Sequence, residues 1–171
     1  MTNSAPEDFV YCPRCATPLV TRPVIDKLRR TCPQCGYIYF TDPKVGVGVF
    51  VVDDDGKVLL VRRRMNPEKG KWSIPAGFLD RGEDPQETAV REALEETNLV
   101  VEIESLIDVY YNAVSSGPGA SIFILYQARL VGGQLRAGDD ADAAAFFGLD
   151  ELPELAFAST RDAIKRLTNN K

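Results

Sequence analysis

The chain has 171 residues, of which 44% are hydrophobic and 26% are charged, and its formal net charge is −5. No apolar run approaches the roughly 20 residues of a membrane-spanning helix, so we expect no membrane role. The acidic balance disfavours general binding to nucleic acid, which rewards a basic surface. Histidine is absent, which excludes Ser-His-Asp and Cys-His catalysis and leaves thiolates and oxygen atoms as metal ligands.

The first ten residues lack the basic stretch and apolar core of a secretory signal, so we expect a cytoplasmic protein. All four cysteines follow in two pairs, Cys12-Pro-Arg-Cys15 and Cys32-Pro-Gln-Cys35, with 16 residues between the pairs. This spacing indicates a four-thiolate zinc site, which has no open coordination position and is therefore structural. The alternative is two disulfides, which need an oxidising compartment.

The pattern changes after the cysteine segment. Two β-branched and apolar runs, residues 45–52 and 57–62, flank a turn at Asp53–Gly56 and predict a β-hairpin. A stretch rich in glycine and proline, residues 70–82, predicts a loop. Further strands are expected at residues 100–111, 121–130 and 143–147, a loop at 115–119, and a terminal helix at 159–167. Strands interleaved with helices predict a mixed sheet covered by helices.

The strongest helix signal covers residues 84–97. Asp84 can cap the helix and Pro85 suits its first position. At about 100° per residue, the three carboxylates of Glu92, Glu95 and Glu96 share one face, whereas residues 90, 93, 94 and 97 form the expected core face. Carboxylates at this spacing repel one another unless a cation lies between them, and magnesium prefers oxygen ligands. The alternative is a solvated acidic face.

This helix lies in a longer pattern, Gly77-x5-Glu83-x7-Arg91-Glu92-Ala93-x-Glu95-Glu96. The pattern resembles the box of the Nudix family, Gly-x5-Glu-x7-Arg-Glu-U-x-Glu-Glu-x-Gly-U, in which U is a bulky apolar residue, and the resemblance extends over residues 77–99. The chain departs from it at Ala93, which is small, and at Asn98, which replaces a glycine but can adopt the left-handed conformation that ends a helix.

The resemblance implies an α/β/α sandwich with a mixed sheet, and roles for individual residues. Glu92, Glu95, Glu96 and the backbone carbonyl of Ala76 would bind magnesium or manganese. Arg91 and Glu83 would form an ion pair that orients these glutamates. Water activated by the metals would attack a diphosphate phosphorus.

The general base and the substrate contacts are less sharply indicated. The acids Asp139, Asp140 and Asp142 occupy the expected region for the base, and we assign it to Asp140; a solvated turn is the alternative. Phosphates are expected to contact arginines at the end of the second strand, Arg62 and Arg64, with Arg63 as a third candidate. Phe78 and Tyr110 are expected to stack on a base or flavin, and Tyr111 and Phe123 are further candidates; core packing is the alternative.

The cysteine segment resembles a zinc ribbon, which predicts a ribbon at residues 1–42 and a Nudix domain at residues 43–171. Among proteins with both parts, the chain resembles the FAD and ADP-ribose pyrophosphatases of plants and bacteria through Asp42–Lys44, Pro75–Leu79 and Leu155–Ser159. Ser105–Ala120 lacks the Ser-Gln-Pro-Trp-Pro-Phe-Pro signature of NADH pyrophosphatases. Alternatives are an NADH pyrophosphatase, an RNA end-processing hydrolase, and a nucleotide-sensing regulator whose ribbon binds DNA or protein. The resemblance also implies a homodimer.

Overall fold

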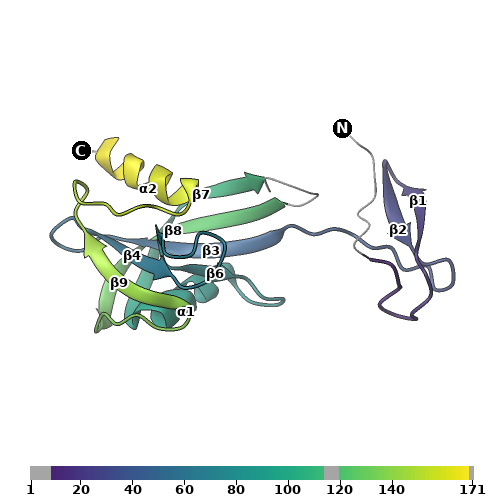
Figure 1. The fold of residues 1–171 in the computed structure, drawn as a ribbon, viewed down its shortest axis with the longest axis horizontal. Helices are drawn as coiled ribbons and strands as arrows, with labels where there is room; N and C mark the ends of the chain where they lie inside the picture. The colour runs from purple at the N-terminus through teal and green to yellow at the C-terminus, as the bar shows by residue number, and fades with distance from the viewer. Residues whose placement is uncertain (1–8, 114–119, 170–171) are drawn as a thin grey trace. The chain divides into compact units, whose positions relative to one another are not determined.

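The computed structural model describes residues 9–113 and 120–169, drawn in Figure 1. The described chain forms two compact units, one ending at Pro43 and the other beginning at Lys44. The loop predicted at 115–119 lies outside the described residues.

The first unit is built around the cysteine pairs. Its hairpin consists of β1 (Val20–Val24) and β2 (Lys27–Thr31), paired antiparallel. Each cysteine pair forms a tight turn in which the first cysteine's carbonyl accepts a hydrogen bond from the fourth residue after it, from Ala16 at 2.9 Å and from Gly36 at 3.1 Å. The buried apolar cluster consists of Cys12, Leu19 and Cys32. The unit therefore has almost no core besides its sulfur atoms.

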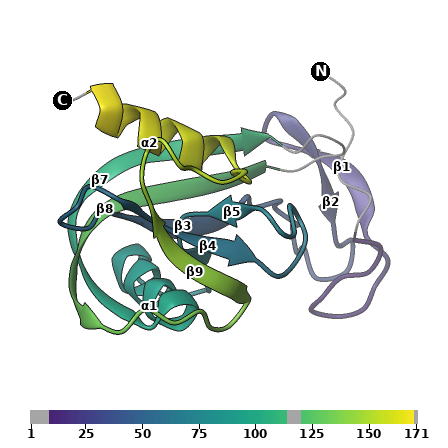
Figure 2. The same ribbon diagram turned by 60° about the vertical axis from the view of Figure 1, so that its left-hand side comes forward.

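The second unit contains two sheets and two helices. The four-stranded sheet has the order β6-β3-β8-β7 and the three-stranded sheet the order β5-β4-β9. The strands of the first are β3 (Lys44–Val51), β6 (Ala76–Phe78), β7 (Leu99–Ala113) and β8 (Ala120–Gly133); those of the second are β4 (Val58–Arg63), β5 (Trp72–Ser73) and β9 (Ala141–Phe147). Figure 2 shows β4 and β9 side by side. β3 and β8 pair in parallel and the other neighbours antiparallel, so the predicted mixed sheet is confirmed.

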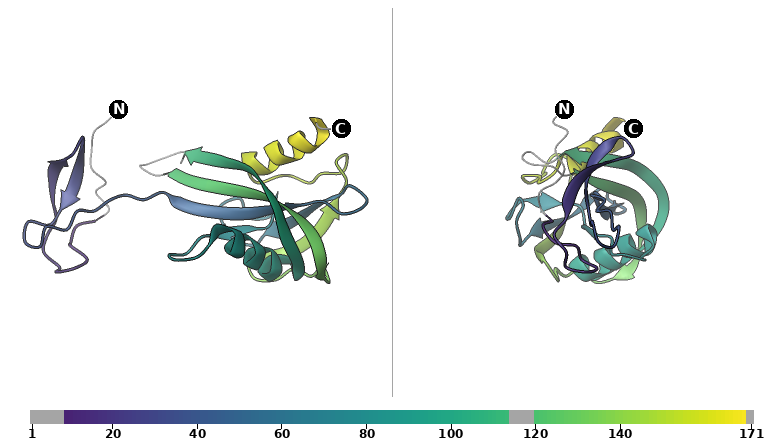
Figure 3. Two further views of the ribbon diagram at one scale, coloured as in Figure 1. Left: turned by 180° about the vertical axis from the view of Figure 1, so that it is seen from behind. Right: turned by 90° about the vertical axis from the view of Figure 1, so that its right-hand side faces the viewer.

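The four-stranded sheet is covered on both faces, because side chains alternate between the faces along a strand. Val47, Val49 and Val51 pack in one buried cluster with α1 (Pro85–Thr97). Phe50 points the other way, into a cluster that includes Ala163 and Ile164 of α2 (Ala158–Asn169). Figure 3 shows the two helices on opposite sides of the sheet. This is the α/β/α layering expected from the sequence.

The predicted hairpin at residues 45–62 is wrong. Its turn forms, with a 2.9 Å hydrogen bond from the Asp53 N–H to the Lys57 carbonyl, but β3 and β4 share only an isolated bridge between Val52 and Val58. The two strands join different sheets because each finds a longer partner elsewhere in the chain, β8 for β3 and β9 for β4. Residues 70–82, predicted as loop, contain the short strands β5 and β6.

The helix predicted at residues 84–97 is confirmed. The Asp84 carboxylate accepts hydrogen bonds from the N–H groups of Gln86 and Glu87, and Asn98 ends α1 in the left-handed conformation with φ of 55°. The predicted division into core and acidic faces is only half right. Leu94, expected in the core, is 46% exposed, whereas Glu96 on the acidic face is 4% exposed. The helix is therefore rotated so that part of its acidic face is buried.

Candidate active site

Of the three clustered carboxylates near the end of α1, two are buried against the edge strand β6. Glu92 and Glu96 are buried and Glu95 is exposed. The N–H of Ala76 donates a 2.9 Å hydrogen bond to Oε2 of Glu96. A Cβ atom at residue 77 would lie 2.0 Å from Cδ of Glu92, so only glycine allows this carboxylate to approach the strand. The spacing between Gly77 and Glu92 in the sequence thus reflects direct contact.

The Ala76 backbone also explains how a carbonyl could reach this cluster. The N–H and C=O of one residue point to the same side of a β-strand, and β6 is the edge of its sheet. The Ala76 N–H bonds to Glu96 on the α1 side, so the Ala76 carbonyl faces the same unpaired edge. This orientation suits the ligand role that the family resemblance implies.

Arg91 connects the carboxylates to the loop that precedes the helix. Its Nη1 lies 3.0 Å from Oε1 of Glu92 and 2.8 Å from Oε2 of Glu95, and its Nη2 lies 3.5 Å from Oε2 of Glu83. Glu83 is held in turn by the N–H of Asp80 and the hydroxyl of Thr88. The first of these bonds does most to lower the pKa of Glu83, so Glu83 stays charged and fixes Arg91.

The buried carboxylates are poorly compensated. Burial is the main reason that the pKa of Glu92 is raised; the charge of Arg91 opposes it, and the charges of Glu95 and Asp139 add to it. Burial, then a side-chain hydrogen bond with Asp140, raises the pKa of Glu96 to about 9. A buried carboxylate without enough positive charge around it favours its neutral form. A divalent cation at this position would favour the charged form instead.

A second segment brings two aspartates to the helix. The N–H of Gly138 donates to the Glu96 carbonyl at 3.1 Å, and a Cβ there would lie 2.6 Å from the Glu95 carbonyl oxygen. This close docking places Asp139 so that its carboxylate and those of Glu92 and Glu95 have oxygen atoms within 4.8 Å of one another. Asp139 thus joins the acid cluster, whereas Asp140, to which the sequence assigned the base, faces Glu96.

A cavity of about 340 Å³ adjoins this cluster. Asp140, Ala76 and Gly77 border the cavity, and the sheet residues Gly46, Phe78 and Phe123 line it with residues that precede or begin α2: Phe157, Ser159 and Thr160. Other lining residues include Arg63, Asn112 and Ser121. Among the described residues, Asp140 is the one carboxylate that lines this partly aromatic cavity, and the backbone of Ala76 and Gly77 separates the cavity from Glu92 and Glu96.

The structure brings some of the predicted substrate residues to this cavity and not others. Phe78 lines it and is 58% exposed. Tyr110 does not line it. Its ring packs against the apolar cluster that contains Ala163 and Ile164 of α2, and its hydroxyl donates a 2.9 Å hydrogen bond to Asp162. Arg62 is engaged by Asp142, with 2.6 Å between Nε and Oδ1. Arg64 is also absent from the lining. Successive side chains of an extended chain point to opposite faces, so Arg62 and Arg64 point away from the face on which Arg63 lines the cavity.

The cavity also contains residues that the sequence indicated weakly or not at all. Arg63, a secondary candidate, lines it, as does Phe123, which lies against Gly46 and Gly48 of β3. Ser159 and Thr160 had no signal beyond the short family match at Leu155–Ser159. No local pattern could have found Thr160, because its position depends on how α2 packs on the sheet.

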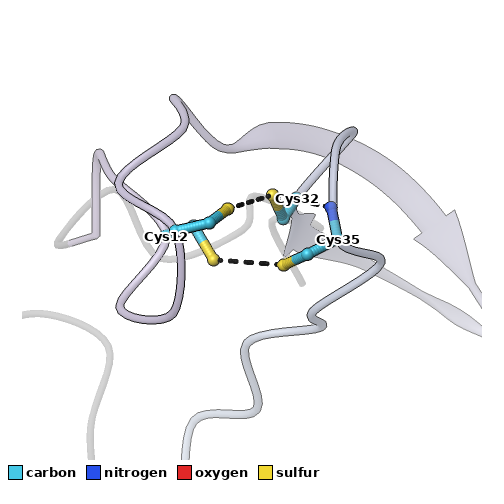
Figure 4. A group of neighbouring side chains, drawn as sticks. Cys12, Cys32 and Cys35 are labelled. Atoms are coloured by element: carbon cyan, nitrogen blue, oxygen red, sulfur yellow. Dashed lines mark hydrogen bonds between the residues drawn. The ribbon is translucent and has the colours of Figure 1, made fainter.

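The four cysteine sulfurs of the first unit lie within 4.8 Å of one another (Figure 4). The Sγ distances are 3.6 Å for Cys12 and Cys35 and 3.5 Å for Cys15 and Cys32. A disulfide would need about 2.05 Å, whereas zinc bonds of about 2.3 Å in a tetrahedron separate sulfurs by about 3.8 Å. Hydrogen bonds with the side chain and backbone of Thr17 lower the pKa of Cys15 to about 6, which favours its thiolate, whereas burial and the three neighbouring cysteines raise the pKa of Cys35 to about 12.

Buried carboxylates on a helix, an arginine that links them to Glu83 in the preceding loop, and an adjoining cavity between the sheet and α2 are the features of a Nudix-type hydrolase. The Nudix domain model matches residues 42–167, and the chain belongs to the Nudix family. It is thus a hydrolase of phosphorus-containing anhydrides, and enzymes of this family generally use divalent metals. Among the described residues, neither helix is long and apolar enough to cross a membrane.

Three relatives illustrate the similarity. The ADP-ribose pyrophosphatase of Methanocaldococcus jannaschii is 41% identical over 121 residues, which cover 71% of this chain and 71% of that protein. The NAD-capped RNA hydrolase NudC of Chromobacterium violaceum is 32% identical over 85% of this chain and 52% of its own length. A solved Nudix hydrolase from Nitrosomonas europaea has a TM-score of 0.84 and 34% identity, and the match covers 95% of this chain and 92% of that one.

Proposed function

We propose that the enzyme hydrolyses the diphosphate linkage of ADP-ribose or FAD and releases AMP and the phosphorylated second moiety. The observation that supports this most is the convergence of Glu92, Glu95 and Asp139 within 4.8 Å, beside a cavity with aromatic walls. The similarity to an archaeal ADP-ribose pyrophosphatase favours ADP-ribose. FAD is the second substrate because its flavin offers a larger ring to the same walls.

The residues of the cluster fit a hard divalent cation. Glu92, Glu95, Glu96, Asp139 and the Ala76 carbonyl would hold magnesium or manganese, both of which prefer oxygen ligands. Such an ion lowers the pKa of water and neutralises charge on phosphoryl oxygens. The raised pKa values of Glu92 and Glu96 are consistent with a site whose positive charge comes with the ligand.

Three further residues of the site, Arg91, Glu83 and Asp140, are proposed to position the helix carboxylates and to accept a proton. Arg91 and Glu83 hold the helix carboxylates in place through the ion pairs described above. Asp140 is the proposed general base, because it lines the cavity while Asp139 belongs to the ion-binding cluster. Loss of the Asp140 carboxylate would then lower kcat without removing metal binding.

The four cysteines are proposed to bind one structural zinc ion. Their spacing and the sulfur distances support this role. We also propose a cytoplasmic homodimer, on family resemblance alone. Static light scattering that gives the mass of one chain would reject the dimer.

The test is product analysis with magnesium or manganese and ADP-ribose, FAD, NADH, a diadenosine polyphosphate and NAD-capped RNA. A Glu95→Gln, Glu96→Gln double variant removes two box carboxylates. The matched control is Glu102→Gln, Glu104→Gln, which changes two exposed glutamates of β7. The proposal requires AMP from ADP-ribose or FAD with the wild type and the control and none with the double variant.

The same panel decides between the alternatives. Preferred turnover of NADH or NAD-capped RNA would favour the second candidate, which the similarity to the NAD-capped RNA hydrolase supports over 85% of this chain. Tight nucleotide binding by both the wild type and the double variant, with no turnover, would indicate a nucleotide sensor and refute the hydrolase.

A further inference from the structure

The last turn of α1 is joined to the segment between β8 and β9, residues 134–140, which carries two aspartates of the site and passes beside the helix (Figure 2). The last four carbonyls of a helix have no partner within it. The N–H of Arg136 donates to the Thr97 carbonyl at 2.9 Å. The N–H of Gly138 donates to the Glu96 carbonyl at 3.1 Å. The segment therefore satisfies two carbonyls at the end of α1.

Asn98 adds a third hydrogen bond, from its side chain. Its Nδ2 donates to the Gln134 carbonyl at 2.8 Å. Asn98 stands where the family pattern has glycine, and its φ of 55° is a conformation that glycine adopts at no steric cost. A glycine would end the helix equally well but could not make this bond. The asparagine thus makes a contact that the helix end by itself does not require.

The backbone around Asn98 also packs tightly against the end of β8. A Cβ atom at residue 133 would lie 2.4 Å from the Asn98 carbonyl oxygen, and Gly133 has a φ of 91°. The segment is therefore held at its start by this backbone contact and by the Asn98 side chain. It is held near its other end by Gly138, whose close approach to the helix is described above. Both ends of the segment are fixed to α1.

Asp139 needs this support because its neighbours repel it. Its carboxylate and those of Glu92 and Glu95 have oxygen atoms within 4.8 Å of one another, and like charges at such distances repel. Within residues 9–113 and 120–169, neither a hydrogen bond nor an ion pair holds the Asp139 carboxylate. Its position before a cation binds therefore depends on how the backbone of its segment is anchored.

We propose that Asn98 is a positioning residue. Its side-chain amide holds residues 134–140 against the end of α1 and so keeps the Asp139 carboxylate in place for a divalent cation. The consequence for turnover rests on the proposed hydrolase function. The consequence for cation binding does not, because it can be measured without a substrate.

The experiment measures manganese binding by electron paramagnetic resonance, without nucleotide, on protein that carries one equivalent of zinc. The variants are Asn98→Gly, Asp139→Asn and the two combined, and circular dichroism checks that each is folded. Asn98→Gly keeps the left-handed end of α1 and removes the side-chain amide. Gln134→Ala is the matched control, because it changes an exposed side chain of the same segment and leaves the accepting carbonyl in place.

Asn98→Gly is expected to raise the Kd for manganese about two- to tenfold, the range for loss of one hydrogen bond, and Gln134→Ala to leave it unchanged. In protein that already carries Asp139→Asn, adding Asn98→Gly should change the Kd by less than about twofold, because the amide then has no carboxylate to position. With ADP-ribose, the magnesium concentration that gives half the maximal rate should follow the same pattern.

An equal effect of Asn98→Gly with and without the Asp139 carboxylate would overturn the proposal, since Asn98 would then act on the helix end and not through Asp139. An unchanged Kd in Asn98→Gly would overturn it as well. Failure of the hydrolase proposal looks different: no substrate is cleaved, yet manganese binding shows the same joint dependence on Asn98 and Asp139.

Discussion

The two units of this protein each contain a cluster of side chains able to hold a metal ion, but the two clusters differ in their relation to the hydrophobic core. In the first unit Cys12 and Cys32 are themselves the core, together with Leu19. In the second unit two apolar clusters surround the sheet, and Glu92 and Glu96 are buried at its edge. A metal ion is therefore expected to be required for the first unit to fold. In the second unit the apolar core already stabilises the fold, and a metal ion would only offset the unfavourable burial of Glu92 and Glu96.

Removal of zinc should give the largest effect and separate the two units. A chelator stronger than the cysteine site is expected to unfold residues 9–43, because structural zinc in small domains contributes about 10–16 kcal/mol. The backbone amides of the second unit should stay protected from hydrogen exchange. Hydrogen exchange measured by peptide mass spectrometry would show both, with zinc content followed in parallel. Retained protection of residues 9–43 in zinc-free protein would remove the contrast.

Glu96→Gln should affect activity and stability in opposite directions. Loss of a metal ligand is expected to lower kcat/KM by more than about 100-fold, the upper range for groups that only support a ligand. Without metal, the folded-state pKa of about 9 lies above the ordinary value of 4.5, so folded protein keeps a proton that unfolded protein releases. Wild-type stability should fall as the pH rises from about 4.5 to 9.

Melting temperatures at pH 5.5 and 8.5, with and without magnesium, check this sign. The stabilisation by magnesium should be larger at pH 8.5, and Glu96→Gln should flatten the decline seen without metal. A wild type whose metal-free stability rises over this interval would contradict the burial argument.

Gly77→Ala tests the close approach at the sheet edge. The new methyl group would lie 2.0 Å from Cδ of Glu92, so either the carboxylate or β6 must move, at a cost of about 1–3 kcal/mol. Chemical denaturation measures the cost and steady-state kinetics the accompanying loss of activity. Gly132→Ala is the matched control, since its Cβ would meet the nearest atom at 3.9 Å. Equal effects of the two changes would show that the approach is not tight.

Asp84→Ala should have the smallest effect. It removes the carboxylate that accepts hydrogen bonds from Gln86 and Glu87 at the start of α1, which costs about 1 kcal/mol. The urea midpoint of the second unit measures this loss. Asp84→Asn, which keeps an acceptor oxygen, should recover most of it. If Asp84→Asn is as unstable as Asp84→Ala, capping is not the reason.

Local patterns in the sequence were sufficient wherever the structure is local. The cysteine pairs, the limits of α1 and the grouping of Glu92 with Glu95 on that helix follow from spacing and capping over a few residues. The ladder between β3 and β8 could not be predicted from local patterns, because its parallel pairing joins residues 77 positions apart, such as Lys44 and Ser121. The hairpin prediction failed for that reason.

The sequence by itself determined the family, the acidic helix and the cysteine cluster, because motif spacing and helix periodicity express chemistry along the chain. Only the tertiary structure decided that Glu92 and Glu96 are buried while Leu94 is exposed, that Asp139 joins the carboxylates, and that Arg63 and Thr160 share a cavity. These outcomes depend on how two sheets and two helices pack, since packing fixes which face of each element is covered and no short stretch of sequence encodes it.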